Sequence, residues 1–302
     1  LASPERRRPA FNLAALPCPC CVPSLLEAAT RKRASVARAS ATRKAAPRKK
    51  ITRRPAARPS PRRIDVHHHI APPVYLEALG ADNLYNGSEG SRRATFDWSP
   101  SMAIEDMDAG GTEVAITSLY AASALAAHPE ARRIARACNE FAVRMREDYP
   151  GRFGGFATLP MPDVDGCLRE IEYALDVLKM DGVDMRTSYG KQWLGDAAFQ
   201  PIYEELNRRK AVVYTHPHEP EFTADLIPGV PGSTIEFCTD TTRTIASLVF
   251  SGTAARFPNV RFIFSHGGGV LPFIVERFTR LGERKDLRSN LPRGVLHELK
   301  KF

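Results

Sequence analysis

The 302-residue chain lacks any long apolar run, and acidic residues are nearly absent from its first fifth. No stretch approaches the roughly 18 consecutive apolar residues that a transmembrane helix needs, so no membrane span is predicted. Residues 1–63 contain 17 Lys and Arg but only two acidic residues, Glu5 and Glu27, a net charge of +15. The rest, with 26 basic and 32 acidic residues, has a net charge of −6. The basic character therefore says little about what residues 64–302 bind.

The same first segment also lacks an apolar period that could build a core. Its composition is rich in Pro, Ala and Arg, as in RKRASVARASATRKAAPRKKITRRPAARPSPRR (31–63), which predicts a disordered tail over residues 1–63. The favoured interpretation is a linker or a mistranslated upstream extension. An organelle-targeting segment and a nucleic-acid or anionic-surface patch remain alternatives, and RRRPAFNLAAL (6–16) resembles a twin-arginine export signal only weakly.

Cysteine is scarce, which argues against a disulfide framework. Three of the six cysteines crowd into CPCC at 18–21, where no partners for a zinc site or a disulfide are apparent. The other three, Cys138, Cys167 and Cys238, are widely spaced and are predicted to be small apolar residues on helices. A reduced, cytoplasmic protein is the expectation.

From Ile64 onward, strand-like and helix-like segments alternate. Helical spacing of apolar residues marks 129–149 and 165–180, and Ser99 with Pro100 predicts a helix start that ends at Gly110. The predicted strands are 64–70, 112–120, 153–159, 181–185, 211–216 and 260–266. This α/β order predicts a parallel sheet of the (β/α)8 TIM-barrel type over residues 64–302. Because the chain stops at HELKKF after six predicted strands, we expect a barrel truncated after about six β/α units. The chain begins at Leu1 rather than Met, so we also expect an incomplete sequence.

Three of the six predicted strands end in histidine, and barrel chemistry collects at the carboxyl ends of strands. These histidines lie in the triplet at 67–69, in VVYTHPH as His216, and in FIFSHGGG as His266. His68 and His218 are predicted to be packing residues or residues that contact the metal ligands from outside. His128 and His297 lie away from the strand ends and have no predicted role.

The period of two along a strand places His67 and His69 on one side and His68 on the other. Two imidazoles at this spacing, facing a barrel interior, can chelate a divalent cation, and His216 is the natural third ligand. Imidazole suits zinc best, with manganese as an alternative. Asp65 is a candidate acceptor that fixes the tautomer of a ligand histidine.

His266 precedes three glycines, which leave its imidazole uncrowded and let the backbone approach a ligand closely. That setting favours a general acid or base over a fourth metal ligand. The glycines lack the spacing and the lysine of a phosphate-binding P-loop.

Three segments together resemble the amidohydrolase superfamily, and most closely the branch that contains aminocarboxymuconate-semialdehyde decarboxylase and 6-methylsalicylate decarboxylase. They are IDVHHH (64–69), THPHEP (215–220) and FPNVRFIFSHGGGVLPFIVERF (257–278). The resemblance covers about residues 63–302. It implies a metal-dependent barrel, often a homodimer, with His67, His69 and His216 as metal ligands and His266 as the catalytic base. It also implies that Arg277 reaches into the neighbouring subunit to hold the substrate carboxylate.

Two departures from the family pattern bear on activity and substrate. No motif like GTDYP, which supplies an aspartate at the eighth strand, is present, and Asp181, Asp184 and Asp240 do not lie in the right order to replace it. Glu105 occupies the position of a substrate-binding arginine. Loss of that cation favours a monocarboxylate such as a hydroxybenzoate, for which Tyr120 and Trp193 are candidate pocket residues or simply packing residues.

The sequence leaves three functional hypotheses. The first is a metal-dependent non-oxidative decarboxylase of a small aromatic or unsaturated carboxylic acid. The second is a hydrolase of a lactone or amide that uses the same histidines. The third is an inactive fragment, or a binding protein dominated by its tail, although nucleic acid is not the favoured partner.

Overall fold

The computed structural model describes residues 63–80, 84, 97–126, 128–224 and 226–302. The predicted tail therefore lies outside the described residues, except for its last member, Arg63. That arginine begins the first strand, where its Nη1 donates to Gly110 O at 2.8 Å. Among the described residues, no helix combines the length and apolar character that crossing a bilayer requires.

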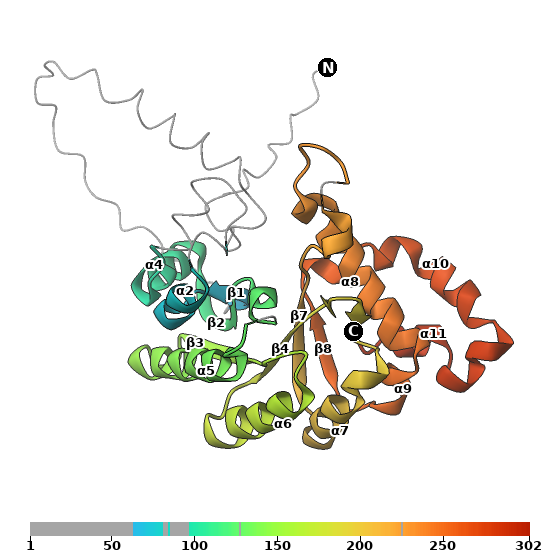
Figure 1. The fold of residues 1–302 in the computed structure, drawn as a ribbon, viewed down its shortest axis with the longest axis horizontal. Coiled ribbons are helices and arrows are strands. Elements are labelled where there is room, and N and C mark those ends of the chain that lie inside the picture. Colours follow the sequence, from blue (N-terminus) through green and yellow to red (C-terminus); the bar gives the residue numbers. More distant parts are fainter. Residues whose placement is uncertain (1–62, 81–83, 85–96, 127, 225) are drawn as a thin grey trace, which may run out of the picture.

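All six predicted strands form, and they pair in parallel in the order β1-β2-β3-β4-β7-β8. The sheet is curled, with β1 and β8 at its two ends rather than paired with each other (Figure 1). The strands are β1 (Arg63–Ile70), β2 (Thr112–Leu119), β3 (Phe153–Thr158), β4 (Gly182–Arg186), β7 (Val212–His216) and β8 (Arg261–Phe264). The predicted barrel-type sheet is confirmed for these strands.

Helices connect successive strands, as a parallel sheet requires. They are α2 (Pro73–Leu79), α4 (Pro100–Gly110), α5 (Ala131–Asp148), α6 (Val164–Glu172), α7 (Gln200–Arg209), α8 (Gly232–Phe250) and α9 (Thr253–Arg256). Two further helices, α10 (Leu271–Gly282) and α11 (Val295–Leu299), follow β8. The start of α4 is as predicted, because Ser99 Oγ accepts from Met102 N at 3.3 Å. The left-handed residue that ends it is Gly111 rather than Gly110.

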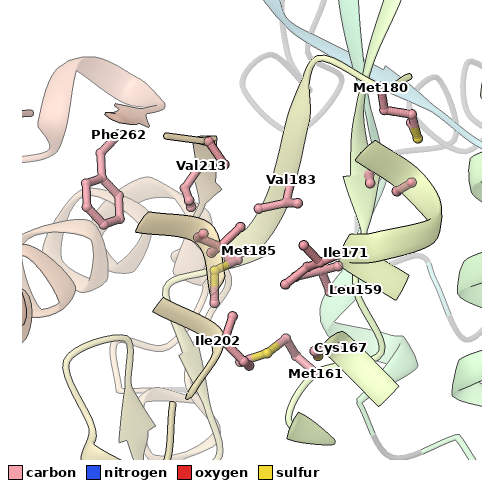
Figure 2. Packing of buried hydrophobic residues seen from close by; sticks show 14 of the residues in the cluster. Leu159, Met161, Cys167, Ile171, Met180, Val183, Met185, Ile202, Val213 and Phe262 are labelled. Carbon is pink, nitrogen blue, oxygen red and sulfur yellow. The ribbon is translucent and has the colours of Figure 1, made fainter. Parts of the chain in front are cut away.

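The main core lies between the outer face of the sheet and the helices that cover it. Figure 2 shows Met185 and Val213 from the strands near Ile202 of α7 and near Cys167 and Ile171 of α6. These side chains are almost fully buried. Cys138 and Cys167 are buried helix residues, as predicted, and burial raises the pKa of the Cys138 thiol to about 12. A buried, protonated thiol is inert, so this layer is structural.

The connection from β4 to α7 contains a small hairpin, β5 (Ser188–Tyr189) and β6 (Gln192–Trp193), that the sequence did not predict. Buried Asp240 of α8 holds it in place. Its carboxylate accepts from Thr187 Oγ1 at 2.5 Å, from Ser188 Oγ at 3.1 Å and from Trp193 Nε1 at 2.9 Å. Asp240 and Trp193 therefore belong to a fully hydrogen-bonded support for the strand ends.

Candidate metal centre

Three histidines from two strands converge inside the curl of the sheet. One ring nitrogen from each of His67, His69 and His216 lies within 4.8 Å of the other two. The Nε2 atoms of His67 and His69 are 3.2 Å apart, and the rings of His69 and His216 have centroids 4.7 Å apart. The structure thus brings together the three residues that the sequence singled out as ligands.

A bulge in β1 decides which neighbours these rings have. Asp65 pairs with Ala115 and His68 with Thr117, so three residues of β1 advance beside two of β2. Such an extra residue breaks the strict alternation of side chains. Asp65 Oδ2 consequently lies 3.4 Å from Nδ1 of His68, and Asp65 Oδ1 accepts from the His67 amide at 2.9 Å. The prediction that Asp65 fixes the tautomer of a ligand ring is wrong, because it contacts the ring of His68 instead.

Two ligand candidates have their second ring nitrogen held by other groups. His216 Nδ1 lies 2.7 Å from Pro217 O, a carbonyl that can only accept, so Nδ1 carries the proton. The buried Nε2 of His216 then bears a lone pair and has no hydrogen-bond partner within the described part of the chain. His69 Nδ1 lies 3.1 Å from Ser118 Oγ, which likewise leaves its Nε2 toward the cluster. A lone pair without a partner among neighbouring imidazoles fits a metal ion.

Burial keeps these imidazoles neutral. It lowers the pKa of His67 to about 4, with a further contribution from the charge of His266, and it lowers the pKa of His69 and His216 well below 6.5. The nearby Arg186 guanidinium is a further cause for all three rings. Neutral imidazole is the form that binds metal ions.

The lowered pKa values predict how the metal-free protein responds to pH. In the unfolded chain a histidine takes up a proton near pH 6.5, whereas folded His67 does so only near pH 4. The contribution of neutral His67 to the free energy of unfolding is therefore fully present above pH 6.5 and is lost as the pH falls toward 4. Thermal denaturation with a chelator present should show a shallower pH dependence for His67→Gln than for wild type. Equal slopes would contradict the prediction.

His266 lies beside the three histidines, two residues beyond β8 rather than inside a strand as predicted. Its ring centroid is 5.1 Å from those of both His67 and His216, and its ring stacks on Phe237 of α8 at 5.9 Å. Burial lowers its pKa. The backbone of His266 has a φ of 52°, a left-handed conformation that is uncommon for non-glycine residues and that it shares with Ala121, Lys179 and Lys210.

The glycines after His266 also contact α8, which the sequence did not predict. Gly267, Gly268 and Gly269 all have positive φ, and Gly269 packs against α8. Val270 N donates to Thr242 Oγ1 of that helix at 3.0 Å. The close backbone approach is therefore to α8, which holds the turn that presents His266.

Gly269→Ala is expected to disturb this turn more than Gly267→Ala. Both positions have φ near +70°, and forcing alanine into that region costs on the order of 1–3 kcal/mol. At Gly269 an added Cβ would also lie 2.2 Å from Cys238 O, whereas at Gly267 nothing lies within 4 Å. Urea denaturation should therefore rank Gly269→Ala below Gly267→Ala in stability. The same stability for both variants would contradict the role of the α8 contact.

A buried ion pair beside the histidines was not predicted as part of the centre. Arg186 is the last residue of β4 and pairs in register with His216, and its side chain is almost fully buried. Its Nη2 donates to Asp184 Oδ2 at 2.6 Å and to Leu119 O at 2.8 Å. Burial raises the pKa of Asp184, which the Arg186 charge partly offsets. An arginine at a strand end is the signal that could have found this pair.

The remaining candidates lie apart from the cluster or contact it only at its margin. Arg277 is exposed on α10 and Glu105 is exposed on α4. Tyr120 lies next to His69, with ring centroids 6.0 Å apart. Trp193 packs against Phe222, and Asp181 Oδ2 accepts from Gly155 N at 2.8 Å, which is a structural contact.

Known proteins share both the sequence and the fold. The decarboxylase yanB of Aspergillus niger is 39% identical over 252 residues, which cover 80% of this chain and 67% of that protein. The 6-methylsalicylic acid decarboxylase acuB of Aspergillus aculeatus is 36% identical over 71% of this chain and 66% of its own length. This chain thus spans about two thirds of each relative.

Among solved structures, a dihydroxybenzoic acid decarboxylase from Polaromonas sp. with bound manganese superimposes with a TM-score of 0.64. It is 24% identical, over 72% of this chain and 69% of that one. At this identity the likeness concerns the fold.

The parallel β/α sheet and the histidines at its strand ends define a barrel-type protein with a candidate metal centre. Its family follows from the sequence match: the chain belongs to the amidohydrolase family, which matches residues 64–288. Within that family it falls in the branch of the decarboxylases, as the resemblance implied.

Proposed function

We propose that this protein is a metal-dependent non-oxidative decarboxylase of a small aromatic carboxylic acid, of the hydroxybenzoate type. One observation carries the proposal. Three imidazole nitrogens lie within 4.8 Å of one another, with a fourth imidazole, that of His266, next to them. The names of the relatives, which include 6-methylsalicylic acid and gamma-resorcylate decarboxylases, support this reaction over others on the same barrel.

His67, His69 and His216 would hold a divalent ion. Three imidazole ligands favour zinc, whereas the Polaromonas decarboxylase, which contains bound manganese, favours manganese. Such an ion would supply a Lewis acid that polarises the carboxylate or a neighbouring hydroxyl of the substrate.

The reaction replaces a carbon–carbon bond by a carbon–hydrogen bond, so the ring carbon that loses CO2 must receive a proton. We assign this proton transfer to His266, because its imidazole lies next to the rings of the ligand candidates His67 and His216. The buried rings of Phe156 and Tyr214, stacked 5.1 Å apart, lie below the cluster, with Tyr214 at 6.0 Å from His67. They exclude water from that side of the centre.

The proposal also assigns Arg277 to the binding of the substrate carboxylate. Because Arg277 is exposed on α10, it is available to a second subunit, and we propose a homodimer in which it holds the substrate carboxylate of the neighbouring centre. Glu105 supplies no cation, which favours a substrate with one carboxylate. A cytoplasmic location remains the proposal for the compartment.

Product analysis tests the proposed reaction. Purified protein, reconstituted in turn with manganese and with zinc, is incubated with salicylate, 6-methylsalicylate and 2,6-dihydroxybenzoate, and CO2 and the phenol are measured. Equal amounts of both products, formed only with metal, are expected. Release of an acid from lactone or amide substrates without any CO2 would instead establish the hydrolase alternative.

A further inference from the structure

Arg186 places a positive charge beside the histidine cluster. Residues paired in register on adjacent parallel strands project from the same face of the sheet, so the side chain of Arg186 enters the interior together with that of His216. From the end of β4 it reaches past β3 to Leu119 O at the end of β2. It therefore crosses the interior of the sheet beside the histidines, and its charge acts on all three ligand candidates.

The hydrogen bonds of this ion pair are incomplete on both sides. Among the residues that the structure describes, Nε of Arg186 has no acceptor and Oδ1 of Asp184 has no donor, although both atoms are buried. Buried charges that serve only the fold are normally fully hydrogen-bonded, because a missing partner is costly. Asp240 follows that rule, with both oxygens bonded, and so does buried Glu170, which accepts from Asn139 and from Arg136. The Asp184–Arg186 pair differs from both structural carboxylates.

A fixed cation at this place affects metal and substrate in opposite ways. It repels a divalent ion that arrives alone, and it attracts the negative charge that an aromatic carboxylate brings. Arg186 pairs in register with His216, whereas Asp184 pairs with Tyr214, two residues before it, so the cation of the pair belongs to the strand position of the ligand candidate.

We propose that Arg186 is a positioning residue that makes the centre selective for anionic aromatic ligands, at the expense of affinity for the metal ion alone. The inference rests on the proposed function, since it takes the three histidines as metal ligands and an aromatic carboxylate as the substrate. It adds a determinant of substrate charge that lies on β4.

Calorimetry can measure both effects without turnover. Manganese is titrated into metal-free protein, and salicylate or salicylamide into manganese-loaded protein near neutral pH. The two aromatic probes share the ring and the hydroxyl and differ in the charge of the carboxyl group. The variant is Asp184→Asn with Arg186→Gln, which removes both buried charges together and so leaves neither unpaired. The matched control, Glu170→Gln with Arg136→Gln, neutralises an ion pair between α5 and α6.

Wild type should bind salicylate more tightly than salicylamide. The Asp184→Asn, Arg186→Gln variant should lose roughly tenfold to a hundredfold of that preference, the worth of a charged hydrogen bond, while its manganese affinity is unchanged or higher. The control should retain the preference. A structural role would instead lower the affinity for manganese and for both probes together.

Three results would overturn the proposal: no preference for salicylate in wild type, an unchanged preference in the variant, or a parallel loss of metal and probe binding. Arg186→Lys, which keeps the charge, provides a second test if the double variant does not fold, and it must retain most of the preference. Failure of the proposed function has a separate signature, since wild type would then bind salicylate selectively and release no CO2.

Discussion

Replacing His67 and His69 together by alanine is expected to abolish metal binding and, with it, CO2 release. The two Nε2 atoms are 3.2 Å apart, so the variant removes both ligands that β1 contributes and leaves His216 alone. Loss of a single supporting contact around a metal can already cost 10–100-fold in affinity, so loss of two ligands should exceed about a hundredfold. Elemental analysis of purified protein should find about one ion per chain in wild type and none in the variant.

His68→Asn is the matched control for this experiment. His68 belongs to the same strand, but its ring packs near Phe153, with centroids 6.3 Å apart, and its Nδ1 faces Asp65. It should keep wild-type metal content. Metal retained by the His67→Ala, His69→Ala variant, or lost equally in the His68 control, would show that the cluster is not the binding site.

His266→Ala is expected to separate catalysis from metal binding. Removal of a positioned acid or base typically costs a factor of about 10²–10⁴ in rate. Because the three ligand candidates do not include His266, metal content should remain that of wild type. The measurement is CO2 release at saturating substrate together with metal content on the same sample.

The matched control for His266 is Phe237→Leu, which removes the stacked ring and keeps the imidazole. It should retain far more of the rate than His266→Ala. Full activity in His266→Ala would assign the proton transfer to another group. A loss of metal in that variant would instead place His266 among the ligands.

The local pattern of the sequence was enough to predict the strands and the three ligand candidates. Alternating apolar residues end in histidine on β1 and β7, and side chains two apart on a strand face one side. This rule correctly grouped His67 with His69. It failed for Asp65, because the bulge between Asp65 and His68 shifts the register, and the pairing of β1 with β2 that reveals the bulge is not visible within one segment.

The roles of Arg186 and of the glycines could not be predicted in the same way. The position of Arg186 depends on its hydrogen bond to Leu119 and its register pairing with His216, which are 67 and 30 positions away in the chain. Gly269 is needed because α8 passes so close that a side chain would meet Cys238 O. Both depend on how elements pack, which neither periodicity nor composition encodes.

The order of strands and helices, the family and the histidines that face the interior of the sheet could be predicted from the sequence alone. These follow from side-chain periodicity and from motifs that each lie within one short segment. Only the packed fold shows that the imidazoles converge within 4.8 Å, that Asp65 contacts His68, and that a buried arginine lies beside them. The physical reason is that distances between strands and the burial of charge arise only when segments far apart in the chain exclude water together.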